Sequence, residues 1–201
     1  MNSLYLLIMK DLIVYLNIIR FWPHLLIGIC CPNSEIIKQD IDGYAKAYKI
    51  QGSIFYKLLY FLFYNKSYRS LFYFRIGNIK WLISWLAKGI ETLTIPKTVK
   101  IGKGLLLFHS YGTILNARSI GVDCRIVHNV TLGDKNGFTP KIGDRVEILP
   151  NAVIVGDITI GNDCVIGPGA VVYKSIPANC VVVGNPAFIL KKDGKIINQP
   201  L

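Results

Sequence analysis

Aliphatic residues recur at every sixth position through the second half of the chain. Four positions after each of them stands a second aliphatic or small residue, such as Val146, Ala152 or Cys164. The unbroken run of this period consists of Ile142, Ile148, Ile154, Ile160, Ile166 and Val172. A period of six fits neither an α-helix nor an alternating strand. It predicts short strands joined by tight turns, with one aliphatic side chain of each strand pointing inward.

The same period extends upstream with two irregularities. We expect one additional residue between Leu107 and Ile114, and a projecting loop over residues 133–141, where the period is interrupted. Gly, Asn and Asp at the predicted bends tolerate the positive φ of tight turns. Three flat faces that close a triangular coil would bring every aliphatic side chain to the axis, and the repeats suffice for about four coils. A sandwich of short strands is the alternative, which six consecutive hexads in one register disfavour.

The first half of the chain has a different pattern. Residues 4–31 and 54–64 are apolar almost throughout, which predicts helices. Residues 1–94 contain 18 of the 23 aromatic residues but only 5 of the 18 glycines. We therefore expect an aromatic-rich helical region over residues 1–94, a β-helix over residues 95–190 and a C-terminal tail over residues 191–201.

Two interpretations of the aromatic region stay open. Its aromatic side chains could pack on one another as a helical cap, or Trp81 and Trp85 with Lys80 and Lys88 could mark helices at a membrane interface. Arg20 interrupts the apolar N-terminal stretch, so that no run reaches the ~18 uncharged residues of a spanning helix. Peripheral membrane contact through residues 1–94 is therefore the alternative to the cap, not a transmembrane segment.

Composition and charge narrow the class of protein. Charged residues make up 17% of the chain and hydrophobic residues 52%, which excludes intrinsic disorder and a long coiled coil. The net charge of +11 is spread along the chain and suits an anionic ligand or an anionic membrane face. Nucleic acid is disfavoured as a partner, because the sequence has no zinc-finger or RNA-binding signature. Five cysteines without metal-site spacing predict a metal-free protein of the reducing cytoplasm, with Cys124 and Cys164 as core residues.

Several motifs resemble one known family. They are Ile101-Gly102-Lys103-Gly104, His109-Ser110-Tyr111-Gly112, Val130-Thr131-Leu132-Gly133, Pro140-Lys141-Ile142-Gly143 and Val183-Gly184-Asn185-Pro186-Ala187. With these motifs, residues 95–190 resemble the hexapeptide-repeat acyltransferases of the serine acetyltransferase type, including relatives that O-acetylate sugars of surface polysaccharides. The resemblance implies a left-handed parallel β-helix, acetyl-coenzyme A as co-substrate, no metal, and a homotrimer with each site between two coils.

Acetyl transfer from a thioester to a hydroxyl needs a general base, and a neutral imidazole suits that role near neutral pH. His109 stands where the six-residue register slips, and an additional residue forms a bulge that re-aims side chains. We therefore expect His109 to be the catalytic base, which is also the role that the resemblance implies; a packed or surface histidine is the alternative. We expect His24 to be structural and His128 to line the acceptor pocket without doing chemistry.

The resemblance also implies binding residues. Asp40 and Asp42 lie in a stretch similar to the family's acidic helical segment. The family has a second histidine in the loop before the Pro-Lys-Ile-Gly motif, and Thr139 takes that position here. All three residues are therefore candidates for the acceptor site. The family's small residues that contact coenzyme A correspond to Gly133, Pro150 and Pro168. Lys174 is the candidate for the coenzyme's phosphates, with a solvated surface charge as the alternative.

Departures from the family bear on the acceptor. The aspartate directly before the family's base is Phe108 here, and a second aspartate fifteen residues before the base is Thr94. Because carboxylates hold an ammonium group, their loss favours a neutral sugar hydroxyl, free or lipid-linked. We expect a cytoplasmic protein, with the inner face of the membrane as the alternative location. We therefore predict an O-acetyltransferase of surface polysaccharide biosynthesis. Serine acetylation for cysteine biosynthesis and a non-catalytic β-helix scaffold are the alternatives.

Overall fold

The computed structural model describes residues 2–201, except for the side chains of residues 2–4 and 6–8. The chain divides into two compact units, and the boundary between them in the sequence falls between Gly89 and Ile90. This division lies five residues before the boundary expected from composition. Residues 191–201 belong to the second unit, where they form strands rather than a separate tail.

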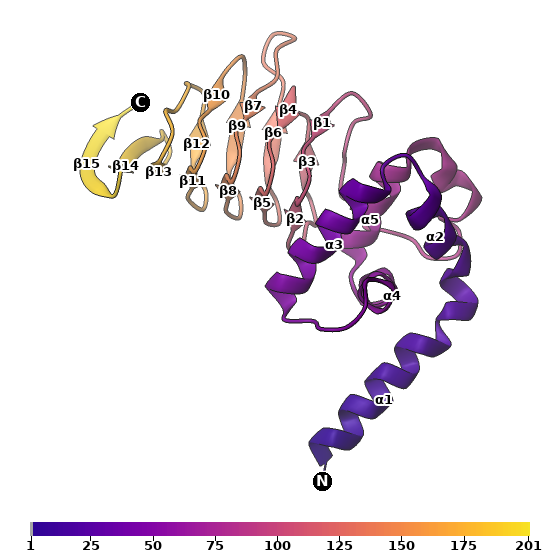
Figure 1. Cartoon of the computed structure of the whole chain (residues 1–201). Helices are drawn as coiled ribbons and strands as arrows, with labels where there is room; N and C mark the ends of the chain where they lie inside the picture. The colour runs from indigo at the N-terminus through magenta and orange to yellow at the C-terminus, as the bar shows by residue number, and fades with distance from the viewer. Residues whose placement is uncertain (1) are drawn as a thin grey trace. The chain divides into compact units, whose positions relative to one another are not determined.

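The second unit is a parallel β-helix whose coils each contribute one short strand to three faces (Figure 1). Face 1 consists of β1 (Lys100–Ile101), β4 (Ser119–Ile120), β7 (Lys141–Ile142) and β10 (Thr159–Ile160). Face 2 begins with β2 (Leu106–Leu107), β5 (Arg125–Ile126), β8 (Glu147–Ile148), β11 (Val165–Ile166) and β13 (Cys180–Val183). Face 3 consists of β3 (Ile114–Leu115), β6 (Thr131–Gly133), β9 (Val153–Val155) and β12 (Val171–Val172). The predicted fold class, a β-helix of hexapeptide repeats after a helical region, is confirmed.

The six-residue period fills the core as predicted. All six aliphatic residues from Ile142 to Val172 are buried, and so are the second residues of each hexad, including Cys124 and Cys164. The expected register upstream is wrong by one residue: Leu115 points inward, and Ile114 is 41% exposed. Leu115 stands eight positions after the inward Leu107, two more than the period of six, so this bend holds two additional residues rather than one.

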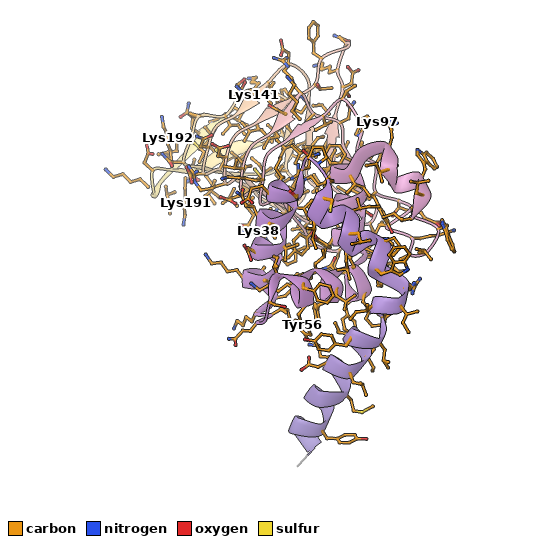
Figure 2. The ribbon with its side chains drawn as sticks, turned by 45° about the vertical axis from the view of Figure 1, so that its right-hand side comes forward. Lys38, Tyr56, Lys97, Lys141, Lys191 and Lys192 are labelled. Atoms are coloured by element: carbon orange, nitrogen blue, oxygen red, sulfur yellow. The ribbon has the colours of Figure 1, made fainter. Side chains whose placement is uncertain are left out.

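The C-terminal end of the β-helix is closed by antiparallel strands. β14 (Phe188–Lys192) pairs with β13, and β15 (Lys195–Pro200) pairs with β14, which extends face 2. Lys191 and Lys192 stand on this extension, as Figure 2 shows. β14 of this hairpin covers the open edge of β13 with backbone hydrogen bonds.

The first unit contains α1 (Asn2–Leu16), α2 (Ile18–Cys30), α3 (Ser34–Tyr48), α4 (Ile54–Tyr64), α5 (Lys66–Ile76) and the 3-10 helix η1 (Gly77–Leu82). Side-chain caps start two of them. The Ser53 hydroxyl accepts from Tyr56 N at 3.2 Å to begin α4, and Asn65 Oδ1 accepts from Tyr68 N at 2.8 Å to begin α5.

Aromatic rings form the core of this helical unit. Tyr44, Phe61, Tyr68 and Phe72 are almost fully buried, and the Tyr44 ring meets those of Phe61 and Tyr68 in edge-to-face contacts of 5.5 and 5.1 Å. These Phe and Tyr residues therefore pack on one another as the cap interpretation expects, whereas others, such as Tyr15 and Tyr64, are exposed. No single described helix is long and apolar enough to span a membrane; Met9–Leu16 and Ile18–Cys30 together pass by length and composition, with a bend of 67°.

Candidate active site

One edge of the β-helix collects four of the candidate site residues. Between face 2 and face 3 the coils turn through His128-Asn129, Pro150-Asn151 and Pro168-Gly169, and through residues 109–112 in the first coil. Backbone hydrogen bonds hold these turns above one another: Asn129 N donates to Tyr111 O at 2.8 Å, and Gly169 N donates to Pro150 O at 2.9 Å. We call this column the histidine edge. His109, His128, Pro150 and Pro168 thus lie along one edge, although they span 60 residues of sequence.

His109 is exposed on this edge in an unusual backbone conformation. Its φ is +49°, in the left-handed region that non-glycine residues rarely adopt. Its carbonyl oxygen accepts from Tyr111 N at 2.5 Å, and Gly112 N donates to Thr92 Oγ1 at 3.1 Å. The two additional residues of this bend therefore make a compact turn that directs the imidazole outward, as the register slip predicted.

The residue before His109 has an aromatic partner instead of a charge. The Arg125 guanidinium lies 4.6 Å from the centre of the Phe108 ring, and Arg125 Nη1 donates to Glu147 Oε1 at 2.7 Å. Arg125 and Glu147 stand in register on β5 and β8. This arrangement presents a ring and a partly exposed ion pair next to the histidine edge, where the resemblance implied a carboxylate.

The other candidate residues of the β-helix lie across face 3. Gly133 ends β6, Thr139 lies in the loop before β7, and Lys174 follows β12, so all three are at the opposite edge of that face. The loop is a hairpin with a Lys135–Phe138 bridge and positive φ at Asn136 and Gly137, and it projects from the coil (Figure 1). Lys174 Nζ donates to Leu201 O at 2.6 Å. Within one chain, face 3 therefore separates the loop from His109.

The two acidic candidates belong to the helical unit and differ in environment. Asp40 is 1% exposed, and its carboxylate accepts from Arg75 Nε at 2.8 Å and from Arg75 Nη2 at 3.2 Å. Asp42 is exposed and pairs with Lys57 at 3.2 Å. Asp40 is therefore committed to a buried ion pair that ties α3 to α5, and Asp42 is the more accessible of the two carboxylates.

Burial makes the thiols of the β-helix core, Cys124, Cys164 and Cys180, unsuitable as reactive groups. Burial raises the pKa of the Cys124 thiol to about 11, which keeps the thiol neutral in the core. Among residues 2–201, His, Cys, Asp and Glu form no group of three or more that could hold a metal ion. His109 and His128 are the two histidines that the fold leaves exposed.

Four neighbours of the site have no signal of their own in the sequence: Arg125, Glu147, Asn129 and Asn151. Asn129 Nδ2 donates to Asn151 Oδ1 at 2.7 Å, and both residues adopt positive φ at equivalent turns. If the 133–141 loop is counted as an insertion, Arg125 aligns with Glu147, and Asn129 aligns with Asn151, on successive coils. Without that alignment, their spacing in sequence carries no signal.

Comparisons with known proteins agree with this geometry. Residues 139–174 match the family model described as bacterial transferase hexapeptide (six repeats). The serine acetyltransferase of Helicobacter pylori strain 26695 is 36% identical over 116 residues, which cover 55% of this chain and 68% of that protein. That of Staphylococcus epidermidis strain RP62A is 35% identical over 123 residues, or 59% of this chain and 58% of that protein.

Solved structures match a larger part of the chain. The Neisseria gonorrhoeae serine acetyltransferase has a TM-score of 0.66 and 28% identity, and the match covers 84% of this chain and 69% of that one. The soybean serine acetyltransferase complexed with serine has a TM-score of 0.63 and 29% identity, with 77% and 68% covered. None of these descriptions mentions a sugar, so the predicted polysaccharide acceptor receives no support from them. The chain is an acyltransferase and belongs to the hexapeptide-repeat family of the serine acetyltransferase type.

Proposed function

We propose that this protein transfers an acetyl group from acetyl-coenzyme A to the hydroxyl of L-serine, with His109 as the general base. The proposal depends above all on the exposed imidazole at the irregular first turn of the histidine edge, in a chain similar to serine acetyltransferases. In this reaction the imidazole takes the hydroxyl proton as the serine oxygen attacks the thioester carbonyl. The C–S bond then breaks, and the departing sulfur receives the proton from the imidazolium.

A homotrimer fits this proposal. His109 and the 133–141 loop lie at opposite edges of face 3, so within one chain this face stands between them. Packing of copies around a threefold axis would set the histidine edge of one copy against the loop edge of the next. One groove between the two copies would then be lined by the coenzyme A candidates Pro150, Pro168, Gly133 and Lys174.

The decisive experiment measures coenzyme A release from acetyl-coenzyme A with L-serine. We expect His109→Ala to lower kcat by about 10²-fold or more, the usual contribution of a general base. His128→Ala is the matched control, because His128 is also exposed on the histidine edge; we expect it to change KM more than kcat. Unchanged turnover in His109→Ala would remove the proposed mechanism.

A second acceptor class is favoured by three residues. Phe108, Thr94 and Thr139 are all uncharged at positions where the resemblance implies ionisable side chains, and Phe108 is engaged by Arg125. A neutral acceptor such as a sugar hydroxyl needs no carboxylate partner. Turnover with methyl hexosides but not with serine would favour that class. A protein whose melting temperature is not raised by acetyl-coenzyme A would instead be a scaffold.

A further inference from the structure

All three tryptophans of the chain lie exposed on the helical unit. Trp22 is on α2, Trp81 is in η1 and Trp85 follows it, with 56%, 71% and 74% of their surfaces exposed. The core of this unit is built from Phe and Tyr, as described above. Tryptophan has the largest aromatic side chain and is the most costly to expose to water, yet this unit exposes all three of its tryptophans.

α2 is apolar on two sides. Its inner side buries Phe21, Leu25 and Gly28. Its outer side exposes residues with the spacing of one helical face, namely Ile19, Trp22, Leu26 and Ile29. A helix at the surface of a protein normally has polar residues on the side that faces water. The apolar outer side of α2 therefore indicates contact with a second apolar environment.

The segment that holds the other two tryptophans lies alongside α2. Arg20 Nε donates to Leu86 O at 2.6 Å, and His24 is linked through the Tyr73 hydroxyl to Ala87 O. We call the exposed side chains of these two neighbouring segments the tryptophan surface: Trp22, Trp81 and Trp85 with Ile19, Leu26 and Leu82. Figure 2 shows side chains projecting outward along the helices of this unit.

Charge on this part of the chain has one sign. Residues 12–34 and 43–90 contain no acidic residue, whereas Arg20, Lys80 and Lys88 lie next to the tryptophan surface in sequence. The Lys80 ammonium group lies 5.7 Å from the centre of a Trp81 ring. Tryptophan rings with neighbouring lysines are typical of the interfacial layer of a bilayer, where the rings lie at headgroup level and the lysines meet anionic lipid.

We propose that the tryptophan surface binds the interfacial layer of a phospholipid bilayer that contains anionic lipids, and so attaches the protein peripherally. A second copy is the less favoured occupant, because a twofold contact through this surface would set its positive charges against each other. The proposal concerns the helical unit alone and does not depend on which acceptor the enzyme uses.

The test uses intrinsic fluorescence of the full-length protein, because every tryptophan reports from this surface. We expect vesicles of phosphatidylcholine with phosphatidylglycerol to shift the emission to shorter wavelength and to co-sediment the protein. Phosphatidylcholine alone should bind more weakly, and high salt should weaken the binding to anionic vesicles. Absence of binding to both vesicle types would overturn the proposal.

Variants locate the contact. Trp81→Ser with Trp85→Ser should lower the vesicle partition coefficient by about tenfold or more, because two large aromatic surfaces are lost. Lys80→Glu should lower it by about tenfold on anionic vesicles, because the charge is reversed. Tyr173→Ser is the control, an exposed aromatic residue of the β-helix unit, and should have no effect. Equal binding by all four proteins would place the contact elsewhere and refute the assignment.

Two further outcomes separate the alternatives. A concentration-dependent blue shift without vesicles, abolished together with self-association by the double tryptophan variant, would assign the surface to a second copy and overturn the membrane proposal. Circular dichroism and coenzyme A release show whether each variant is folded. Vesicle binding retained by an inactive His109→Ala would leave this proposal intact, whereas acetyl transfer without vesicle binding in the unaltered protein would defeat this proposal alone.

Discussion

At the residue scale, folding separates the three histidines by environment. His24 is completely buried in α2, and desolvation, with the positive charges of Arg69 and Arg20, lowers its pKa to about 4. Tyr73 donates its hydroxyl hydrogen to Ala87 O, so His24 donates from Nε2 to the Tyr73 oxygen at 2.9 Å. His24 is therefore a neutral structural residue, which leaves the proton chemistry to the exposed histidines.

The two aspartates of α3 differ in the same way. Asp40 and Arg75 form a pair with side chains 1% and 4% exposed, whereas Asp42 and Lys57 are 53% and 22% exposed. The Tyr68 hydroxyl is also buried, and desolvation together with the charge of Asp40 raises its pKa well above the usual value. Removing one charge from the buried pair leaves the other without compensation, whereas the exposed pair is screened by water.

We predict that Asp40→Asn lowers the free energy of unfolding by about 3–5 kcal/mol. Asp42→Asn, the matched control on the same helix, should lower it by no more than about 1 kcal/mol. Urea titrations followed by circular dichroism compare the two. Equal stability of both variants would contradict a structural role for Asp40. A fall in acetyl transfer with Asp42→Asn at unchanged stability would instead support its place in the acceptor site.

At the scale of the element, glycine sets the distance between successive coils. Gly102, Gly121, Gly143 and Gly161 each follow the inward aliphatic residue of face 1. A Cβ on Gly102 would lie 2.6 Å from Gly121 O, and a Cβ on Gly121 would overlap Asp144 Oδ1 and Gly143 O. These glycines are needed for close approach between coils, whereas Gly112 and Gly169 at the histidine edge are needed for positive φ.

We predict that Gly121→Ala lowers the free energy of unfolding by about 3 kcal/mol, because the Asp144 side chain could move aside but the overlapping Gly143 O belongs to the backbone of the next coil. Gly194→Asn is the control: its Cβ would meet no atom within 4 Å, and asparagine tolerates the φ of +78° there. We expect a loss below about 1 kcal/mol for the control. Thermal unfolding of both variants measures the difference, and a fully stable Gly121→Ala would show that the coils can separate locally at little cost.

At the scale of the whole molecule, His109 and the 133–141 loop lie at opposite edges of face 3, so we propose that a second copy completes the site. A mixture of two inactive chains tests this proposal. One chain has His109→Ala, and the other has a shortened 133–141 loop. Only a site with His109 from the second chain and the loop from the first would be intact.

We predict that co-expression of these two chains restores about a quarter of the unaltered activity, the fraction of neighbouring pairs with both parts intact in random closed rings. Coenzyme A release by the purified mixture measures it. Each variant expressed alone is the control and should stay nearly inactive. No recovery in verified mixed oligomers, or full activity of the shortened-loop chain, would contradict a site shared between copies.

The amino-acid sequence determined the β-helix, because a six-residue period constrains every coil and leaves few alternative folds. It also singled out His109 as the candidate base, since the register slip marks an irregular turn; the catalytic role of His109 stays a prediction. The tertiary structure decided that two residues are added there, that Leu115 rather than Ile114 faces the axis, and that Arg125 pairs with Phe108 and Glu147. These features depend on which coils are stacked, a relation between residues about twenty positions apart that no local pattern contains.

In the helical unit, too, the sequence pattern left features open that only the tertiary structure decides. Its composition predicted helices and left two uses for the aromatic residues open. Only the structure shows which aromatic residues form the core: Tyr44, Phe61 and Tyr68 are buried, whereas all three tryptophans and some tyrosines, such as Tyr15, are exposed. Likewise, sequence similarity made Asp40 and Asp42 equivalent candidates. Only packing separated them, since the cost of burying one carboxylate is offset solely where Arg75 reaches it.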